Sequence, residues 1–197
     1  MTKKRESDPV IVSVDAYSAD PDAYLRRYAD HLLDRPNRFA SLLAQPARIL
    51  DLGCGPGRDL RIFTEAGHRP IGIELNPRFV EIARRHGEVV EADIRDVRDA
   101  FSPSSFDGIW AQASLVHLSR AEVVHVLSDL RDLLVPSGRL YACVPATGAT
   151  GWYDEEDGRR WYTTWPNDEF ADAVTSAGFR ADDTTDGVYV EVWATRR

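Results

Sequence analysis

The sequence has few cysteines and no long hydrophobic run, and each shortage excludes a class of protein. Only two cysteines, Cys54 and Cys143, occur among 197 residues, so the chain is not a disulfide-stapled secreted scaffold. We expect both thiols to be reduced in the cytoplasm. No apolar stretch approaches the roughly 20 residues of a membrane span, and none follows the charged start of the chain. We therefore expect neither a membrane helix nor a signal peptide.

The sequence also has fewer basic than acidic side chains. Asp and Glu together number 32 against 24 Lys and Arg, which gives a net charge of −8. Binding to a nucleic-acid backbone depends on basic side chains that neutralise phosphates, and anionic membranes attract the same side chains. We therefore expect no nucleic-acid and no membrane partner. The sequence also lacks an H-E-x-x-H motif, a cysteine pair and a close set of histidines and carboxylates, so no metal site is predicted.

Residues 48–57, Arg-Ile-Leu-Asp-Leu-Gly-Cys-Gly-Pro-Gly, are the most informative stretch. The apolar start predicts a buried strand. Gly53, Gly55 and Gly57 predict a tight turn whose backbone N–H groups can approach a ligand closely. The residues that follow predict a helix that stops near Gly67. Strand, glycine loop and helix together form the nucleotide-binding corner of doubly wound α/β folds.

The spacing of this motif separates two cofactors. A dinucleotide fingerprint needs G-x-G-x-x-G, but the third glycine position holds Arg58, which disfavours an NAD-dependent oxidoreductase. Residues 51–57 instead read D-x-G-x-G-x-G. Glu74 then closes the next apolar run, about twenty residues after the first glycine, where an acidic side chain can accept hydrogen bonds from both ribose hydroxyls.

Residues 51–57 resemble motif I of the class I S-adenosylmethionine-dependent methyltransferases, and Glu74 strengthens the resemblance. It implies an α/β fold with a Rossmann-like, doubly wound, mostly parallel seven-stranded sheet, an antiparallel last strand and helices on both faces. It also implies S-adenosyl-L-methionine as the cofactor and S-adenosyl-L-homocysteine as its product. We expect residues 47–197 to form the methyltransferase core and residues 1–46 an N-terminal tail and helical lid, within a single domain.

The resemblance also implies which residues hold the cofactor. Asp51 and its loop would place the amino-acid end, and Glu74 would bind the ribose. Asp93 would accept the adenine amino group, with a helix cap or a solvated turn as the alternative. Tyr17 and Tyr28 precede the core and would fold over the cofactor, with ordinary helix packing as the alternative for Tyr28. The full expected set is Asp51, Gly53, Gly55, Gly57, Glu74, Leu75, Asp93, Ile94, Ala111, Tyr17 and Tyr28.

His117 is the candidate general base. It lies two residues before Ser119, the first residue of a capping box that predicts a helix start. A helix N-terminus disfavours an imidazolium and keeps the ring neutral, as a base must be. The alternative is a histidine that only bonds a neighbouring backbone group. The candidate substrate contacts are Gln112, Trp152, Arg160 and Trp161, with a turn cap or a packed surface loop as the alternatives.

We expect a cytoplasmic methyltransferase that acts on an oxygen or nitrogen atom of a small molecule, in secondary metabolism or detoxification. We expect a monomer or a homodimer. Two other functions stay open. One is methylation of tRNA or protein, which the acidic charge disfavours. The other is a regulator that binds the cofactor without turnover.

Overall fold

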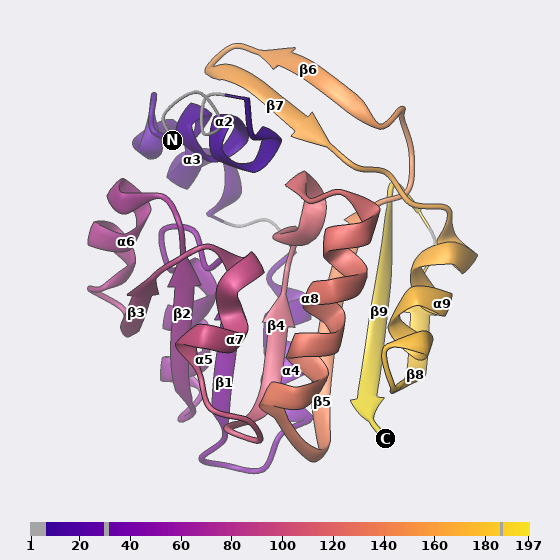
Figure 1. Cartoon of the computed structure of the whole chain (residues 1–197). Coiled ribbons are helices and arrows are strands. Elements are labelled where there is room, and N and C mark those ends of the chain that lie inside the picture. The colour runs from indigo at the N-terminus through magenta and orange to yellow at the C-terminus, as the bar shows by residue number, and fades with distance from the viewer. Residues whose placement is uncertain (1–6, 30–31, 186) are drawn as a thin grey trace.

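The computed structural model describes residues 7–29, 32–185 and 187–197. Figure 1 shows one central sheet with helices on both faces and a separate hairpin above its upper edge. The sheet contains β1 (Arg48–Leu52), β2 (Arg69–Glu74), β3 (Glu88–Glu91), β4 (Phe106–Ala111), β5 (Leu134–Pro145), β8 (Phe179–Thr185) and β9 (Tyr189–Arg196). The helices are α2 (Pro9–Ala16), α3 (Pro21–Tyr28), α4 (Asp34–Ser41), α5 (Arg58–Glu65), α6 (Pro77–Ala83), α7 (Val97–Ala100), α8 (Arg120–Leu133) and α9 (Asn167–Ser176).

The strand order is β3-β2-β1-β4-β5-β9-β8. Strands β1 to β5 pair in parallel, whereas β9 runs antiparallel to both of its neighbours. The predicted seven-stranded, mostly parallel sheet with an antiparallel last strand is therefore confirmed. Because the parallel strands end at one edge, the loops after β1, β2 and β4 meet there, which is where open α/β sheets bind ligands.

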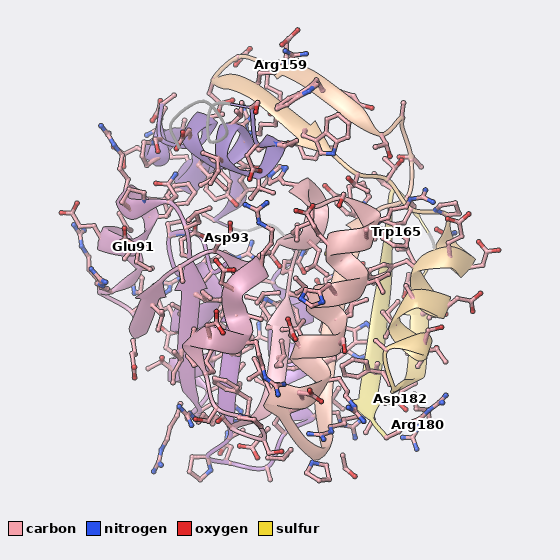
Figure 2. The ribbon with its side chains drawn as sticks, viewed as in Figure 1. Glu91, Asp93, Arg159, Trp165, Arg180 and Asp182 are labelled. Atoms are coloured by element: carbon pink, nitrogen blue, oxygen red, sulfur yellow. The ribbon has the colours of Figure 1, made fainter. Side chains whose placement is uncertain are left out.

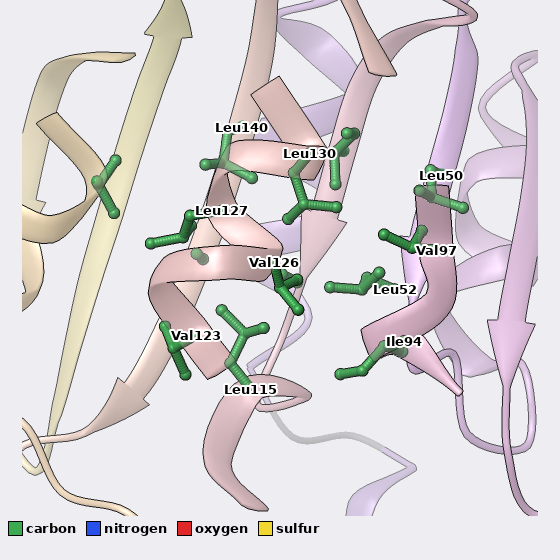
Figure 3. Packing of buried hydrophobic residues seen from close by; sticks show 14 of the residues in the cluster. Leu50, Leu52, Ile94, Val97, Leu115, Val123, Val126, Leu127, Leu130 and Leu140 are labelled. Atoms are coloured by element: carbon green, nitrogen blue, oxygen red, sulfur yellow. The ribbon is translucent and has the colours of Figure 1, made fainter. Parts of the chain in front are cut away.

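Alternating side chains of the central strands fill two cores, one on each face of the sheet. On one face, Val123, Val126, Leu127 and Leu130 of α8 pack with residues such as Leu50, as Figure 3 shows. The opposite core is aromatic, and the rings of Trp110 and Tyr141 stack in it at 4.1 Å. Its other buried members are Phe39, Ala40, Ala47, Ile49, Phe63, Cys143 and Trp193.

The capping box predicted at the start of α8 is confirmed. The Ser119 side chain accepts a hydrogen bond from the Glu122 backbone N–H, and the Glu122 carboxylate accepts one from the Ser119 backbone. Two donors of the first turn are thereby satisfied reciprocally. The short 3-10 helix η2 (Leu115–His117) joins β4 to this start, so the end of β4 and the beginning of α8 are held at the ligand-binding edge.

Within the described residues, the expected N-terminal tail already contains a helix. Helix α2 begins at Pro9, and Asp8 caps it by accepting a hydrogen bond from the Val10 backbone N–H at 2.9 Å. Proline at the first helical position after an aspartate cap is a favourable helix start. The β-branched residues that follow are weak helix formers. Burial of Val10 and Ser13 therefore supports this helix.

Three more differences concern the second half of the chain. The stretch expected to be an irregular loop is a hairpin of β6 (Gly151–Glu155) and β7 (Gly158–Tyr162). The strand at residues 179–185 was not located from the sequence, because it lies at the sheet edge and only Phe179 of it is buried. Val188, expected to face inward in the last strand, is 67% exposed and precedes the first residue of β9.

Candidate functional site

The glycine loop after β1 has the backbone that the motif predicts. Gly53, Gly55 and Gly57 all have positive φ angles, of 64°, 54° and 86°. A Cβ at Gly53 would stand 2.7 Å from the Ser114 Cβ, and one at Gly57 would stand 2.9 Å from the Ala83 Cα. Side chains are therefore excluded by conformation and by space. The loop packs directly against the segment after β4 and against α6.

Glu74, at the end of β2, binds this loop through a backbone N–H group. One carboxylate oxygen accepts a hydrogen bond from the Gly55 backbone N–H at 2.9 Å, and the other accepts from Leu75 at 2.8 Å and Asn76 at 2.7 Å. Burial raises the pKa of Glu74, and the three N–H groups oppose that rise. A carboxylate has about four acceptor positions. Three are used within the protein, which leaves capacity for a ribose hydroxyl.

A pocket of about 540 Å³ opens beside the glycine loop, within the range of roughly 300–1,000 Å³ typical of small-molecule sites. Asp51 and Gln112 line it. Within the described parts of the chain, Oδ2 of Asp51 and Oε1 of Gln112 are buried acceptors without a hydrogen-bond partner. An unpaired buried acceptor costs about 1–3 kcal/mol. The ammonium group of S-adenosylmethionine brings three donors, so these residues fit the amino-acid end of the expected cofactor.

Binding of S-adenosylhomocysteine is expected to release protons. Burial first, and then the neighbouring carboxylate of Asp59, holds the pKa of Asp51 well above its usual range. An ammonium group beside Asp51 favours its charged form and lowers that pKa, so a partly protonated carboxyl loses its proton on binding. Affinity should therefore weaken as the pH falls through the raised pKa. Calorimetry in two buffers of different ionisation enthalpy measures the release, with up to one proton expected per site.

The matched variant for this measurement is Asp51→Asn, which keeps the size of the side chain and cannot titrate. It should bind without releasing the proton. Equal binding enthalpies in both buffers for the natural sequence would show that Asp51 is already ionised in the free protein, and would contradict the expectation.

Arg58 stands where a dinucleotide fingerprint has its third glycine. In the structure its side chain links three parts of the site. Its Nε lies 2.7 Å from Oδ1 of Asp59, and its Nη1 donates to the Tyr28 carbonyl at 2.9 Å. Oδ2 of Asp59 in turn accepts from the Trp110 indole N–H at 2.8 Å. The end of α3, the start of α5 and the aromatic core therefore form one network beside the pocket.

The expected adenine contacts lie under α2. Leu75, Ile94 and Val14 of α2 belong to one hydrophobic cluster. Asp93 caps the 3-10 helix η1 (Ile94–Asp96) by accepting from the Arg95 backbone N–H, and it pairs with the Arg95 side chain at 2.6 Å. Figure 2 shows Asp93 below the N-terminal helices. These contacts remain predictions, and an adenine ring there would lie directly beneath α2.

Tyr17, His117 and Trp161 form a half-buried series of hydrogen bonds. Nδ1 of His117 lies 2.5 Å from the Trp161 carbonyl oxygen, and Nε2 lies 3.0 Å from the Tyr17 hydroxyl. Burial lowers the pKa of His117 to about 4, so the ring is neutral at pH 7. A carbonyl only accepts, so Nδ1 carries the hydrogen and Nε2 accepts from the tyrosine. Of the two side chains, Tyr17 is the one that lines the pocket.

The hairpin divides the candidate substrate residues between its two faces. Trp152 pairs with Trp161, and Tyr153 pairs with Arg160. Directly opposed residues in an antiparallel pair share a face. Trp152 and Trp161 therefore lie on one face, where their rings meet edge to face at 5.7 Å, and Arg160 lies on the other. Figure 2 shows Arg159 at the outer side of the hairpin.

Arg160 points toward the N-terminal helices and is 1% exposed. Its guanidinium carbon lies 4.1 Å from the centre of the Tyr17 ring. The guanidinium is also paired with the carboxylates of Glu155 and Asp157. Its charge is thus balanced inside the protein, so it does not by itself favour an anionic ligand.

Sequence reasoning missed several pocket residues. Val116 follows β4 and Pro145 is the last residue of β5, and their place at the carboxyl edge of the sheet was a usable signal. Tyr162 and Tyr189 carried no such signal, because the hairpin and the antiparallel β9 bring them to the pocket from distant parts of the chain. Of the expected residues, those that line it are Tyr17, Tyr28, Asp51, Gly53, Gly55 and Gln112.

Residues 49–138 match a family model described as a methyltransferase domain. The chain is 35% identical over 136 residues to an uncharacterised 37.1 kDa transposon protein of Streptomyces fradiae, which covers 62% of this chain and 39% of that protein. It is 32% identical over 101 residues to a ubiquinone biosynthesis O-methyltransferase of Xanthomonas euvesicatoria, which covers 48% of this chain and 41% of that protein. The chain thus spans about two fifths of the length of these two relatives.

A similar solved structure is the 1,6-didemethyltoxoflavin-N1-methyltransferase of Burkholderia thailandensis with bound 1,6-didemethyltoxoflavin and S-adenosylhomocysteine. It has a TM-score of 0.74 at 25% identity and covers 93% of this chain and 84% of that one. In the described ranges of the chain, no helix has the length and apolar character to cross a membrane. Across the same residues, no three His, Cys, Asp or Glu side chains gather as a metal site would require.

Proposed function

Because the chain carries a class I S-adenosylmethionine-dependent methyltransferase domain, we propose that it transfers the methyl group to an oxygen or nitrogen atom of a small molecule. S-Adenosyl-L-methionine is the cofactor of this domain. The observation that carries the proposal is the pocket. Its glycine-loop side has the orphaned acceptors that suit the cofactor, and its other side is lined by Val116, Pro145, Tyr162 and Tyr189.

A small acceptor is favoured because the pocket is roofed. Helices α2 and α3 and the hairpin lie above the sheet edge in Figure 1, and Ser13 of α2 accepts a hydrogen bond from the Trp161 backbone N–H at 2.8 Å. A roof of this kind confines the amino-acid end of the cofactor and the acceptor together to about 540 Å³. We propose that residues 1–46 act as this lid and that residues 47–197 form the core. The net charge of −8 further disfavours RNA.

We propose the following contacts within the pocket. Asp51 and the glycine loop hold the amino-acid end of the cofactor, Glu74 holds its ribose, and Gln112 offers its free oxygen to a donor on the acceptor. Buried and free cysteines at 54 and 143 suit a reducing compartment, and we place the enzyme in the cytoplasm. The ubiquinone and toxoflavin methyltransferases to which the chain is similar are compatible with this substrate class.

Two measurements test the proposal. Purified protein should bind S-adenosylhomocysteine and not NAD in a calorimetric titration. With methyl-labelled S-adenosylmethionine, the label should enter the small-molecule fraction of a metabolite extract and not added tRNA or protein. Label in tRNA or protein would replace the proposal with the polymer alternative. Binding without any transfer would favour a regulator.

A further inference from the structure

The hydroxyl of Tyr17 stands between the pocket and the buried ring of His117. Tyr17 lines the pocket together with Gln112, Val116 and Tyr162. On its far side the hydroxyl meets Nε2 of His117 at 3.0 Å. The two residues lie 100 positions apart in the chain, so the fold, and not local sequence, aligns them. The tyrosine oxygen therefore offers a hydrogen-bonded path from a molecule in the pocket to His117.

The hydrogen-bond partners fix where each proton starts. The Trp161 carbonyl orders His117 with its hydrogen on Nδ1, so the lone pair of Nε2 faces Tyr17. The Tyr17 hydroxyl then donates to Nε2 and keeps two lone pairs on its own oxygen. Burial and the neighbouring Tyr162 keep the pKa of Tyr17 well above its usual range, so the phenol starts protonated. Tyr17 can therefore accept a proton from a molecule in the pocket and donate its own proton to His117.

We propose that Tyr17 is a catalytic residue that takes the proton of the methyl acceptor while it passes its own to His117, an inference that rests on the proposed methyltransferase function. Bound S-adenosylmethionine supplies a methyl group on a sulfonium, whose sulfur keeps the C–S electron pair as the new C–O or C–N bond forms. The acceptor O–H or N–H bond breaks and a bond to Tyr17 Oη forms. The Tyr17 O–H bond breaks and a bond to His117 Nε2 forms.

Charge and atoms balance in this relay. Tyr17 begins and ends as a neutral phenol, so no buried phenolate is required. The positive charge that the sulfonium loses develops on His117, which becomes an imidazolium. The Trp161 carbonyl continues to accept the hydrogen bond from its Nδ1–H. After the product leaves, the imidazolium gives its proton to water and the starting state returns. Because a nucleophile becomes strongly acidic as it gains a methyl group, a weakly basic imidazole is sufficient at the end of the relay.

The environment of His117 makes its imidazolium a transient species and not a stable one. From the hairpin, Arg160 lowers the pKa of His117 and Glu155 raises it, and both effects are smaller than that of burial. From the N-terminal segment, only the neutral hydroxyl of Tyr17 meets the ring among the described residues. The Tyr162 ring lies 5.1 Å from it. Arg160, over the face of the Tyr17 ring, lowers the pKa of the phenol and so opposes part of the rise that burial causes.

The relay restricts the chemical class of the methyl acceptor. A free amine needs no base, because the methylated ammonium is stable and loses its proton to water later. A hydroxyl or a ring N–H keeps its proton at neutral pH and must lose it during transfer, which a relay assists. We therefore infer an acceptor that is methylated at a hydroxyl or at a ring N–H.

Tyr17→Phe tests the relay, with Tyr153→Phe as the matched control that removes a hydroxyl from the hairpin outside the pocket. Transfer to the acceptor found in the extract should slow about 10²-fold in Tyr17→Phe, the size expected for acid–base catalysis. Affinity for S-adenosylhomocysteine should stay within twofold. The solvent deuterium dependence of the natural enzyme should show two protons in flight, and Tyr153→Phe should match it.

A second measurement needs no acceptor. Nitrogen-15 NMR of the histidines, with S-adenosylhomocysteine bound, should find His117 neutral at pH 7 with its hydrogen on Nδ1. A hydrogen on Nε2, or an undiminished transfer rate in Tyr17→Phe, would overturn the relay while leaving the methyltransferase function intact. Failure of the natural protein to bind S-adenosylhomocysteine would instead contradict the proposed function itself.

Discussion

Glu74→Ala should weaken S-adenosylhomocysteine binding about 10²-fold. The loss has two sources. The ribose loses its acceptor, which costs about 1–3 kcal/mol. The backbone N–H groups of Gly55, Leu75 and Asn76 also lose the carboxylate that now receives them at 2.7–2.9 Å, so the glycine loop is no longer held in its binding conformation. The sum corresponds to about 2.7 kcal/mol, since each tenfold is about 1.4 kcal/mol. Calorimetric titration measures it.

Two further variants separate these sources. Glu74→Gln keeps one oxygen for Leu75 and Asn76 but turns an amide N–H toward the Gly55 donor, so it should fall between the alanine variant and the natural protein. Glu81→Ala removes an exposed glutamate from α6 and should leave binding unchanged. A folded Glu74→Ala protein with unaltered affinity would remove Glu74 from the cofactor site.

Trp110→Ala should lower the free energy of unfolding by about 3–5 kcal/mol, the range for deleting a buried large aromatic side chain. Trp110 is fully buried on β4 and stacks on Tyr141 at 4.1 Å, with Phe39 at 5.3 Å. Its indole N–H also satisfies Asp59. Removing it leaves a cavity in the aromatic core and takes one of two donors from Oδ2 of Asp59, which Arg58 still contacts at 3.0 Å. Urea unfolding followed by circular dichroism measures the loss.

Trp110→Phe divides that loss into packing and hydrogen bonding. It retains a ring against Tyr141 but removes the donor to Asp59 and part of the indole volume, so it should cost less than the alanine variant. Trp152→Ala, on the outer face of the hairpin, deletes the same side chain from a partly exposed position and should cost under about 1 kcal/mol. Equal costs for Trp110→Ala and Trp152→Ala would contradict the assignment of Trp110 to the core.

Local patterns made the core of the fold predictable. The glycine loop is encoded in seven consecutive residues, and its conformation follows from the chemistry of glycine. The end of β2 at Glu74 and the capping box at Ser119 are likewise encoded by neighbours in the sequence. The order of strands and helices then fixes the parallel sheet, since a right-handed crossover leaves few alternatives.

The upper part of the site was not predictable in the same way. Helix α2 is built from β-branched residues that favour strands, and only the Asp8-Pro9 start signals a helix. The hairpin strands place polar and aromatic side chains on both faces, so no alternating pattern marks them. The contact between Tyr17 and His117 joins positions 100 residues apart and depends on both of those elements. Tertiary contacts therefore decide this region.

Helix α2 makes polar contacts on two sides. Its Val14 carbonyl accepts from the Asn76 side chain at 3.1 Å and its cap, Asp8, pairs with Arg95 at 3.0 Å, both on the nucleotide side. Ser13 is bonded to the hairpin at Trp161. The contacts of α2 therefore join the ends of β2 and β3 to the hairpin, so a change that loosens this one helix disturbs both of these regions together.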